Sequence, residues 1–400
     1  MIEPGVTELL AEIAEHIAPH RSEAELQEML ARNPKEFFDA ICLQAVEEKA
    51  ADIFWKAGSP PSLRISARIV QMDIEPLTVK QMEEIFLNNV MTEEQREKFK
   101  SRPELDTALE IPGIIRFRVN IYRQRGGIAS VMRLIPLDLP TLEELGLPKV
   151  LASLVTHKQG MVLVTGPTGS GKTTTLAALM DLINTNRRCN VIAIEDPIEF
   201  VHRDKLSIMS QREVGVDTNN FHDALRAVLR QAPDVILVGE MRDVETMSVA
   251  MTAAETGHLV FSTVHTNSAS ETIERIVNMF PPHEKPQICL RLSTTLLGIL
   301  SQKLVPMVDG RGRVCSIEVM INTPTIAKLI EEGRAGMVLA AINEGGYWGM
   351  QSMNMSLLNH FKDGKIDEKT AVAYAGNATE MRQAIRRLAQ ARITTSASTM

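Results

Sequence analysis

Between residues 160 and 265, short apolar runs alternate with stretches of helical periodicity, and this alternation restricts the possible folds more than any other feature. The apolar runs are MVLVTG, NVIAIED, DVILVGE and HLVFSTVHT, and the helical stretches between them are TTTLAALMDLI, FHDALRAVLRQ and VETMSVAMTAAETG. Strands separated by helices do not pair through tight hairpins, so this order is typical of a parallel sheet with helical crossovers. The predicted fold class is α/β, and the carboxyl ends of the strands are the expected place for a binding site.

A glycine-rich loop, GPTGSGKT, joins the first of these strands to the first helix and matches the pattern G-x-x-x-x-G-K-[ST]. Glycines allow backbone N–H groups to surround phosphate, and the helix N-terminus adds partial positive charge. We expect Lys172 to reach the β- and γ-phosphates and the Thr173 hydroxyl to help hold Mg²⁺. The predicted ligands are therefore ATP and Mg²⁺. The predicted nucleotide-binding residues are Gly166, Pro167, Thr168, Gly169, Ser170, Gly171, Lys172, Thr173 and Thr174.

Two other strand ends carry carboxylates. In VILVGEMRD, Gly239 stands where P-loop enzymes commonly have an Asp that holds Mg²⁺, and Glu240 is the first carboxylate available. Our hypothesis is that Glu240 orients or deprotonates the attacking water, whereas a cap or an ion pair with Arg242 is the structural alternative. In IEDPIEF, residues 194–200, Glu195, with Asp196, would assist through the metal and its waters. The predicted metal-site residues are Thr173, Glu195 and Glu240.

Histidines lie at both ends of the strand LVFSTV. His265 is at the end expected to face the nucleotide, where it would sense the γ-phosphate. His258 is at the opposite end and is interpreted as part of a subunit contact or of the core. Arg226 and Arg230 share one helix face. They could bind the nucleotide, contact a neighbouring subunit, or lie on a solvated or salt-bridged face.

The chain before the parallel sheet predicts a separate α+β domain that ends near Pro136. Capping boxes begin helices at Ser22 and Thr92, PPSLRISARIVQM alternates like one half-buried strand, and residues 114–122 and 129–136 read as strands joined by RQRGG. Leu9, Leu10, Ile13 and Ile17 repeat at helical spacing. A basic group on this domain, from Arg116, Arg118 and Arg133, could complete a phosphate site when domains or subunits close, as an arginine finger does.

The remaining segments predict a linker and a helical C-terminal region. PLDLPTLEELGLP is interpreted as an interdomain linker with a short capped helix at Thr141–Glu144. Helices are expected from about residue 270, and the polar tail TTSASTM is expected to be disordered.

Composition excludes several classes of function. The net charge of −7 gives no reason to expect non-specific nucleic-acid binding, although it leaves a local basic patch open. No apolar run has the length of a membrane span. The acidic N-terminus MIEPGVTELLAEIAEHI does not resemble a signal peptide. Cys42, Cys189, Cys289 and Cys315 are isolated, which argues against a zinc site and favours a reducing compartment, so the expected location is the cytoplasm.

Several motifs together resemble one family, the type IV pilus retraction ATPases of the PilT and PilU kind, within the secretion-superfamily hexameric ATPases. The resemblance runs from about residue 45 to about residue 390. Its motifs follow the family order: EKAADIFWKAGSPPSLRI, RFRVN, GPTGSGKTTTLAALMDLIN, IEDPIEFVHRDKLSIMSQREVGVDT, LRQAPDVILVGEMRD and TAAETGHLVFSTVHTNSASETIERIVNMFP.

The resemblance implies a domain plan and residue roles. It implies a PAS-like domain over residues 45–136, a linker over 137–149 and a RecA-like P-loop ATPase domain over 150–375, with a helical extension over 1–44 and a C-terminal helix and tail over 376–400. By the same resemblance, Glu195 corresponds to the Asp-box glutamate and Glu240 to the catalytic glutamate of the Walker B motif. His258 and His265 correspond to the two His-box histidines, and Arg118 and Arg133 to N-domain arginines that approach the nucleotide.

The resemblance also implies partners. It implies a homohexamer at the cytoplasmic face of the inner membrane that drives pilus disassembly through the platform protein. Ala327 and Lys328 stand where the PilT-type motif AIRNLIRE has arginine and asparagine, which argues against retraction without help. GRGRVCSIEVMINTP and NATEMRQAIRRL are more similar to PilU, the accessory type, and this implies a PilT-like principal retraction ATPase as a partner.

Three other functions are alternatives to pilus retraction. An extension or secretion ATPase of the same superfamily usually carries a tetracysteine zinc module, which the isolated cysteines argue against. A hydrolysis-poor scaffold subunit is disfavoured by Lys172, Thr173 and Glu240. A DNA translocase requires a basic channel, and the acidic total charge offers no support for one.

Overall fold

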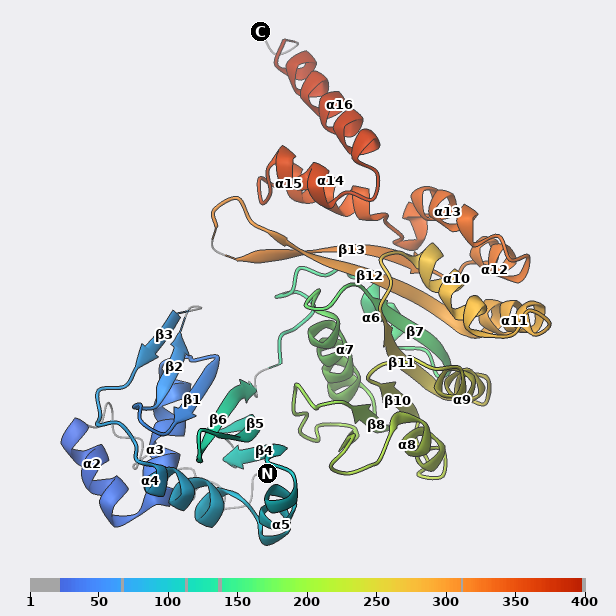
Figure 1. Ribbon diagram of the computed structural model, residues 1–400. Helices are drawn as coiled ribbons and strands as arrows, with labels where there is room; N and C mark the ends of the chain where they lie inside the picture. Colours follow the sequence, from blue (N-terminus) through green and yellow to red (C-terminus); the bar gives the residue numbers. More distant parts are fainter. Residues whose placement is uncertain (1–21, 66–67, 112–113, 136–138, 311, 398–400) are drawn as a thin grey trace. The chain divides into compact units, whose positions relative to one another are not determined.

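The computed structural model describes residues 22–65, 68–111, 114–135, 139–310 and 312–397 of the chain (Figure 1). The chain divides into two compact units, Met1–Leu137 and Asp138–Met400, and each is described by itself. No helix in the described ranges has the length and apolarity needed to cross a membrane.

The first unit is built on a sheet that has six strands in its described part, in the order β3-β2-β1-β6-β5-β4, with antiparallel pairing throughout. Phe37, Phe38, Trp55 and Phe86 form an aromatic cluster in its core, with ring centroids from 5.3 to 6.2 Å apart. The strands are β1 (Asp52–Lys56), β2 (Ser62–Ile65), β3 (Arg68–Gln71), β4 (Glu104–Ile111), β5 (Ile115–Gln124) and β6 (Gly127–Ile135). The helices are α2 (Glu23–Arg32), α3 (Pro34–Glu47), α4 (Val79–Glu83), the π-helix η1 (Glu84–Val90) and α5 (Glu93–Ser101).

The two helix starts and the strand pair predicted for this unit are confirmed. Both capping boxes are present, at Ser22 and at Thr92, and the two strands before and after RQRGG are β5 and β6. The prediction of one strand over PPSLRISARIVQM is wrong, because β2 and β3 pair antiparallel there, with Arg64 opposite Ile69. The alternation continues from β2 into β3, so it did not reveal that the segment contains two strands. The predicted helix through Leu9 and Ile17 lies outside the described residues.

The second unit contains the predicted parallel sheet. The described part has seven strands in the order β13-β12-β7-β11-β10-β8-β9. The parallel strands are β7 (Gly160–Thr165), β8 (Asn190–Glu195), β9 (Ile208–Glu213), β10 (Val235–Val238) and β11 (Leu259–Val264), and β12 (Leu296–Pro306) joins β7 in parallel and β13 (Arg313–Ile321) antiparallel.

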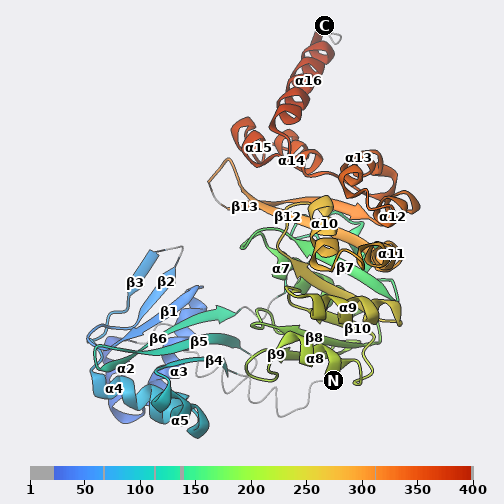
Figure 2. The same cartoon turned by 45° about the vertical axis from the view of Figure 1, so that its right-hand side comes forward.

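Helices cover both faces of this sheet (Figures 1 and 2). Alternate residues of each strand face opposite layers, as a strand period of two requires. Val162, Val164 and Leu237 pack on the side of α6 (Leu151–Leu154) and α7 (Lys172–Asn186). Met161 and Leu163 pack on the other side, with α8 (Phe221–Val228), α9 (Val244–Glu255), α10 (Ala269–Met279) and α11 (Lys285–Thr295).

Three predictions for this unit are wrong. The helical region expected from about residue 270 is interrupted by β12 and β13, whose apolar runs complete the sheet edge. Thr141–Glu144 forms a turn and not a helix, although it has the hydrogen bonds of a capping box. A helix cannot extend from it because Gly146 and Pro148 follow directly. Within the tail TTSASTM, residues 394–397 continue α16 instead of being disordered, while residues 398–400 lie outside the described part.

The C-terminal helices follow β13. They are α12 (Pro324–Glu331), α13 (Val338–Glu344), α14 (Met353–Lys362), α15 (Glu368–Tyr374) and α16 (Ala378–Ala397), with 3-10 turns η2 (Ala335–Met337) and η3 (Gly346–Trp348). A small core holds α14, α15 and α16 together against Val305 of β12.

Candidate active site

The glycine-rich loop has the backbone that the motif predicts. Gly171 has a φ of 89° and is the N-cap of α7, a left-handed conformation that suits glycine. Gly166 has a φ of 142°, and a Cβ there would lie 2.5 Å from the Gln302 carbonyl oxygen and from Ser170 Oγ. Other side chains at these positions would force the loop away from the start of α7, where backbone N–H groups collect.

Lys172 begins α7 and is almost fully buried, with 8% of its surface exposed. Its Nζ donates hydrogen bonds to the carbonyl oxygens of Gly166 at 2.9 Å and Pro167 at 3.0 Å. Burial lowers the pKa of Lys172, and the carboxylates of Glu240 and Glu199 oppose that shift. The two carbonyls keep the ammonium beside the loop, within a side-chain rotation of a phosphate bound there.

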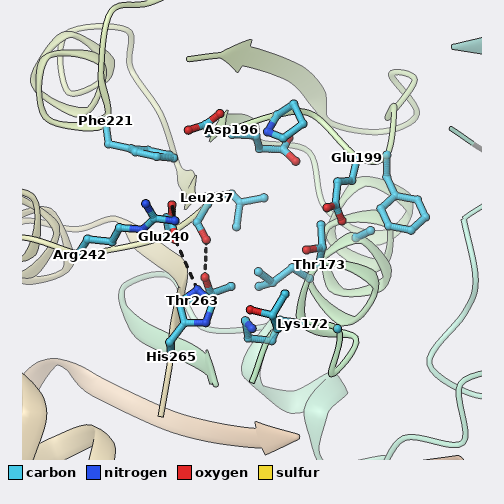
Figure 3. Close-up of a pocket in the computed structure, with 18 of the residues that line it drawn as sticks. Lys172, Thr173, Asp196, Glu199, Phe221, Leu237, Glu240, Arg242, Thr263 and His265 are labelled. Atoms are coloured by element: carbon cyan, nitrogen blue, oxygen red, sulfur yellow. Dashed lines mark hydrogen bonds and ion pairs between the residues drawn. The ribbon is translucent and has the colours of Figure 1, made fainter. Parts of the chain in front are cut away.

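Backbone contacts between strand ends position Glu240. The N–H of Gly239 donates to the carbonyl of Ile194 at 2.8 Å, and Thr263 Oγ1 donates to the carbonyl of Gly239 at 2.6 Å (Figure 3). A Cβ at position 239 would lie 3.2 Å from that Ile194 oxygen, tighter than most real contacts. Close approach of the strand ends therefore favours glycine here, and the carboxylate falls on the next residue.

The Glu240 carboxylate lies between two nitrogen-bearing side chains (Figure 3). Its Oε1 is 2.6 Å from Arg242 Nη2, and its Oε2 is 3.5 Å from His265 Nε2. The Glu240 side chain is 15% exposed, whereas that of Arg242 is 73% exposed. The ion pair that was the structural alternative for Glu240 is thus present, and it leaves the carboxylate on the wall of a cavity.

Glu195 ends β8 and is buried, with 6% of its surface exposed. Burial is the main reason that its pKa rises to about 7. The hydrogen bond from Gln211 Nε2 to its Oε1, 2.9 Å long, lowers the pKa, and Glu199 and Glu213 raise it. This carboxyl group can therefore exchange a proton near neutral pH.

The loop and the strand ends border one cavity of about 310 Å³. Figure 3 shows Lys172 and Thr173 on one side of it and Glu240 and His265 on the other. Its lining residues are Thr168, Gly169, Lys172, Thr173, Leu176, Ala177, Glu195, Asp196, Pro197, Glu199, Phe200, His202, Phe221, Leu237, Gly239, Glu240, Arg242, Thr263 and His265. The cavity can accept a phosphate with an attacking water between a cationic loop and two carboxylates.

Other predicted site residues lie elsewhere. His258 is at the far end of β11, where its Nδ1 is 2.9 Å from the carbonyl oxygen of Ala253, and it does not line the cavity. Arg118 and Arg133 belong to the first unit, opposite each other on β5 and β6, and Arg133 Nε pairs with Asp52 at 3.0 Å. Arg226 is exposed on α8.

The sequence reading missed part of the cavity wall. Glu199, Phe200 and His202 follow β8 in a loop without regular structure. The one sequence signal for them is that IEDPIEF lies at a strand end. Burial lowers the pKa of His202 to about 4, so its imidazole is neutral at physiological pH. Phe221 contributes from the first turn of α8.

The donor set fits Mg²⁺ held together with phosphate. The described residues contain no group of three or more His, Cys, Asp or Glu side chains that could hold a metal by themselves. Mg²⁺ commonly takes one or two protein oxygens and completes its shell with phosphate and water. The Thr173 hydroxyl and the carboxylates of Glu195 and Glu240 line the same cavity, and they are hard oxygen donors of the required kind.

Comparison with known proteins gives consistent matches along the chain. Residues 31–395 match the family described as "Type II/IV secretion system protein". "Type IV pilus retractation ATPase PilT" of Pseudomonas aeruginosa is 44% identical over 82% of this chain and 94% of its own length. "Type IV pilus ATPase PilU" of the same organism is 41% identical over 87% of this chain and 91% of its own length.

Solved structures agree with these matches. The structure of the pilus retraction motor PilT with bound ADP has a TM-score of 0.80 and 42% identity, and the match covers 86% of this chain and 98% of that one. The Legionella pneumophila ATPase DotB has a TM-score of 0.70 and 30% identity, and the match covers 84% and 94% of the two chains.

The parallel sheet, the phosphate-binding loop and the carboxylates at the strand ends define a P-loop ATPase, an enzyme that hydrolyses ATP. The small N-terminal α+β unit accompanies the ATPase fold, as the predicted fold class requires. The chain belongs to the family of type II/IV secretion system proteins, and within it groups with PilT and PilU. The resemblance in the sequence motifs is confirmed.

Proposed function

We propose that this chain is a motor that couples ATP hydrolysis to retraction of a type IV pilus, as an accessory to a principal retraction ATPase. The observation that carries the proposal is the cavity in which Lys172, Thr173, Glu195, Glu240 and His265 meet, because motor activity requires a complete hydrolysis site. The direction of the motor is supported by the names and the 41–44% identity of PilT and PilU.

In the proposed hydrolysis step, Glu240 orients a water that attacks the γ-phosphorus and accepts a proton from it, while the bond from the γ-phosphorus to the bridging oxygen breaks and ADP leaves. Lys172 leaves the carbonyls of Gly166 and Pro167 and donates to the phosphate oxygens, where negative charge develops. His265 lies 3.5 Å from Glu240. It would contact the γ-phosphate and so link the presence of that phosphate to the position of the carboxylate. Glu195 supplies a second carboxyl group near the reacting centre. Mg²⁺, held by the Thr173 hydroxyl with Glu195 and Glu240, would neutralise phosphate charge when bound.

The proposed motor is a homohexamer in which two domains move against each other. Residues 45–136 would form the PAS-like domain, residues 150–375 the RecA-like domain and residues 137–149 the linker between them. Arg118 and Arg133 would approach the nucleotide on closure, and His258 would lie at a subunit contact. A few kcal/mol of differential nucleotide affinity is enough to close such an interface.

The accessory role is supported by α12. In the stretch TPTIAKLIEEG, Ala327 and Lys328 replace the arginine and asparagine of the PilT-type motif. The Lys328 side chain is 74% exposed and reaches Glu332 only at 3.9 Å, so it is presented to solvent and not used by the core. We assign this helix to the surface where the chain depends on a PilT-like partner. The proposed location is the cytoplasmic face of the inner membrane, against the pilus platform protein.

Two measurements test this function. Solution scattering of the purified chain, with and without nucleotide, should give the mass of a hexamer and a shape that changes when ATP is added. Pilus retraction should then be recorded in cells that lack this chain, the principal motor, or both. Weaker retraction under load without this chain supports the proposal, whereas unchanged retraction in every background contradicts it.

A further inference from the structure

Gln211 lies behind Glu195 and does not line the cavity. It belongs to β9, the edge strand of the sheet, and stands in register with Ala193 of β8. The Gln211 side chain lies beside the end of β8, within hydrogen-bond distance of Glu195. The Gln211 amide makes three hydrogen bonds there.

Each of these bonds ties a part of the cavity wall to the sheet. The Gln211 Nε2 donates to Glu195 Oε1 at 2.9 Å and to the carbonyl oxygen of Phe200 at 2.8 Å. The Gln211 Oε1 accepts a hydrogen bond from the backbone N–H of His202 at 2.8 Å. One amide therefore connects a buried carboxylate with the irregular loop that carries Glu199, Phe200 and His202.

A glutamine suits this position for a chemical reason. Glu195 has two carboxyl neighbours, Glu199 and Glu213. A further carboxylate at position 211 would repel Glu195, and it could not donate a hydrogen bond to it. An apolar residue would leave the buried carboxylate and the Phe200 carbonyl without this donor. A neutral amide donates to both and still accepts from His202.

We propose that Gln211 is a positioning residue for ATP hydrolysis, which orients the Glu195 carboxylate and holds the loop from Asp196 to His202 against the cavity. This inference rests on the proposed hydrolysis mechanism. Gln211 acts through Glu195 and does not touch the nucleotide. Its loss should therefore lower kcat and leave the KM for ATP nearly unchanged.

The test is a double-mutant cycle on the full chain, with steady-state hydrolysis of Mg²⁺-ATP as the readout. Gln211→Met keeps the side-chain length and removes all three hydrogen bonds. We expect kcat to fall about 10- to 100-fold, as for other residues that orient a functional group from behind. In a Glu195→Gln background, the same substitution should change kcat by less than about twofold, because the group it orients is already altered.

Two variants serve as controls. Gln383→Met makes the same change at an exposed position of α16 and should leave kcat at the wild-type value. Gln211→Glu keeps the size and the acceptor for the His202 N–H but cannot donate to Glu195. It should lose at least as much activity as Gln211→Met, and it carries the test if the methionine variant does not fold.

Three outcomes would overturn the inference. They are wild-type kcat in Gln211→Glu, equal losses from Gln211→Met in both backgrounds, and no loss of kcat in Glu195→Gln itself. The inference and the pilus function can fail separately. Normal pilus retraction in cells without this chain would remove the motor role, while the coupling between Gln211 and Glu195 in the purified enzyme would remain.

Discussion

Glu240→Gln is the most direct perturbation of the proposed chemistry. The substitution keeps the size of the side chain and its place between Arg242 and His265, but it removes the charge and most of the basicity. The P-loop and Lys172 are unchanged, so nucleotide affinity should be preserved. The variant should bind ATP and fail to hydrolyse it.

The structure sets the expected magnitude. A positioned carboxylate that orients water and takes its proton contributes about 10²- to 10⁴-fold to a rate. A 100-fold loss of kcat corresponds to about 2.7 kcal/mol of transition-state stabilisation. The cost to folding should be small, because Arg242 is 73% exposed and ion pairs with exposed partners contribute about 0–1 kcal/mol.

The assay is single-turnover hydrolysis of Mg²⁺-ATP, together with the affinity for a non-hydrolysable ATP analogue. Glu245→Gln is the matched control, since Glu245 is exposed in the first turn of α9 and does not line the cavity. If Glu240→Gln retained a single-turnover rate constant within about threefold of wild type, the water-positioning role would be wrong. The ion pair with Arg242, the structural alternative, would then be favoured for this carboxylate.

Three further predictions concern binding and stability. Lys172→Ala should weaken ATP binding at least about tenfold in a titration, because the loop loses its only side-chain ammonium within the described cavity lining; unchanged affinity would contradict the role of Lys172. The pKa of Glu195, raised from 4.5 to about 7, favours folding while the group is protonated, so its contribution is full below pH 4.5 and is lost as the pH rises through about 7. Chemical denaturation of the nucleotide-free protein should therefore show a decline of up to about 3 kcal/mol between pH 5 and 8 that is absent in Glu195→Gln, and parallel profiles would refute this assignment. Trp55→Ala should cost about 3–5 kcal/mol in the unfolding of the first unit, because Trp55 is 1% exposed and contacts three aromatic rings; Trp348→Ala, at a side chain with 53% exposure, is the control and should cost less than about 1 kcal/mol.

Local sequence signals were sufficient where one short segment contained all the information. The alternation of apolar runs with helical stretches predicted β7, β8, β10 and β11 because each strand is buried on both faces. The pattern did not reveal β9, whose alternating exposure belongs to an edge strand, or the β12–β13 pair within a stretch read as helical. Whether such segments form strands depends on the neighbouring strands with which they pair.

The candidate site shows the same division. GPTGSGKT predicted the phosphate-binding loop by itself, since the glycines and the lysine act within one turn of chain. The loop that carries Glu199 and His202 has no comparable pattern, and its hydrogen bonds to Gln211 join residues 9 and 11 positions apart. Such contacts arise only when β9 is placed beside β8.

The sequence alone therefore determined the α/β class, the nucleotide loop and the strand ends that carry Glu195, Glu240 and His265, because periodicity and short motifs act over a few residues. Tertiary structure decided which of these groups share a cavity, and it added Glu199, His202 and Phe221 to the cavity wall. It also set the raised pKa of Glu195, since desolvation depends on everything packed around a carboxyl group and not on its neighbours in the chain.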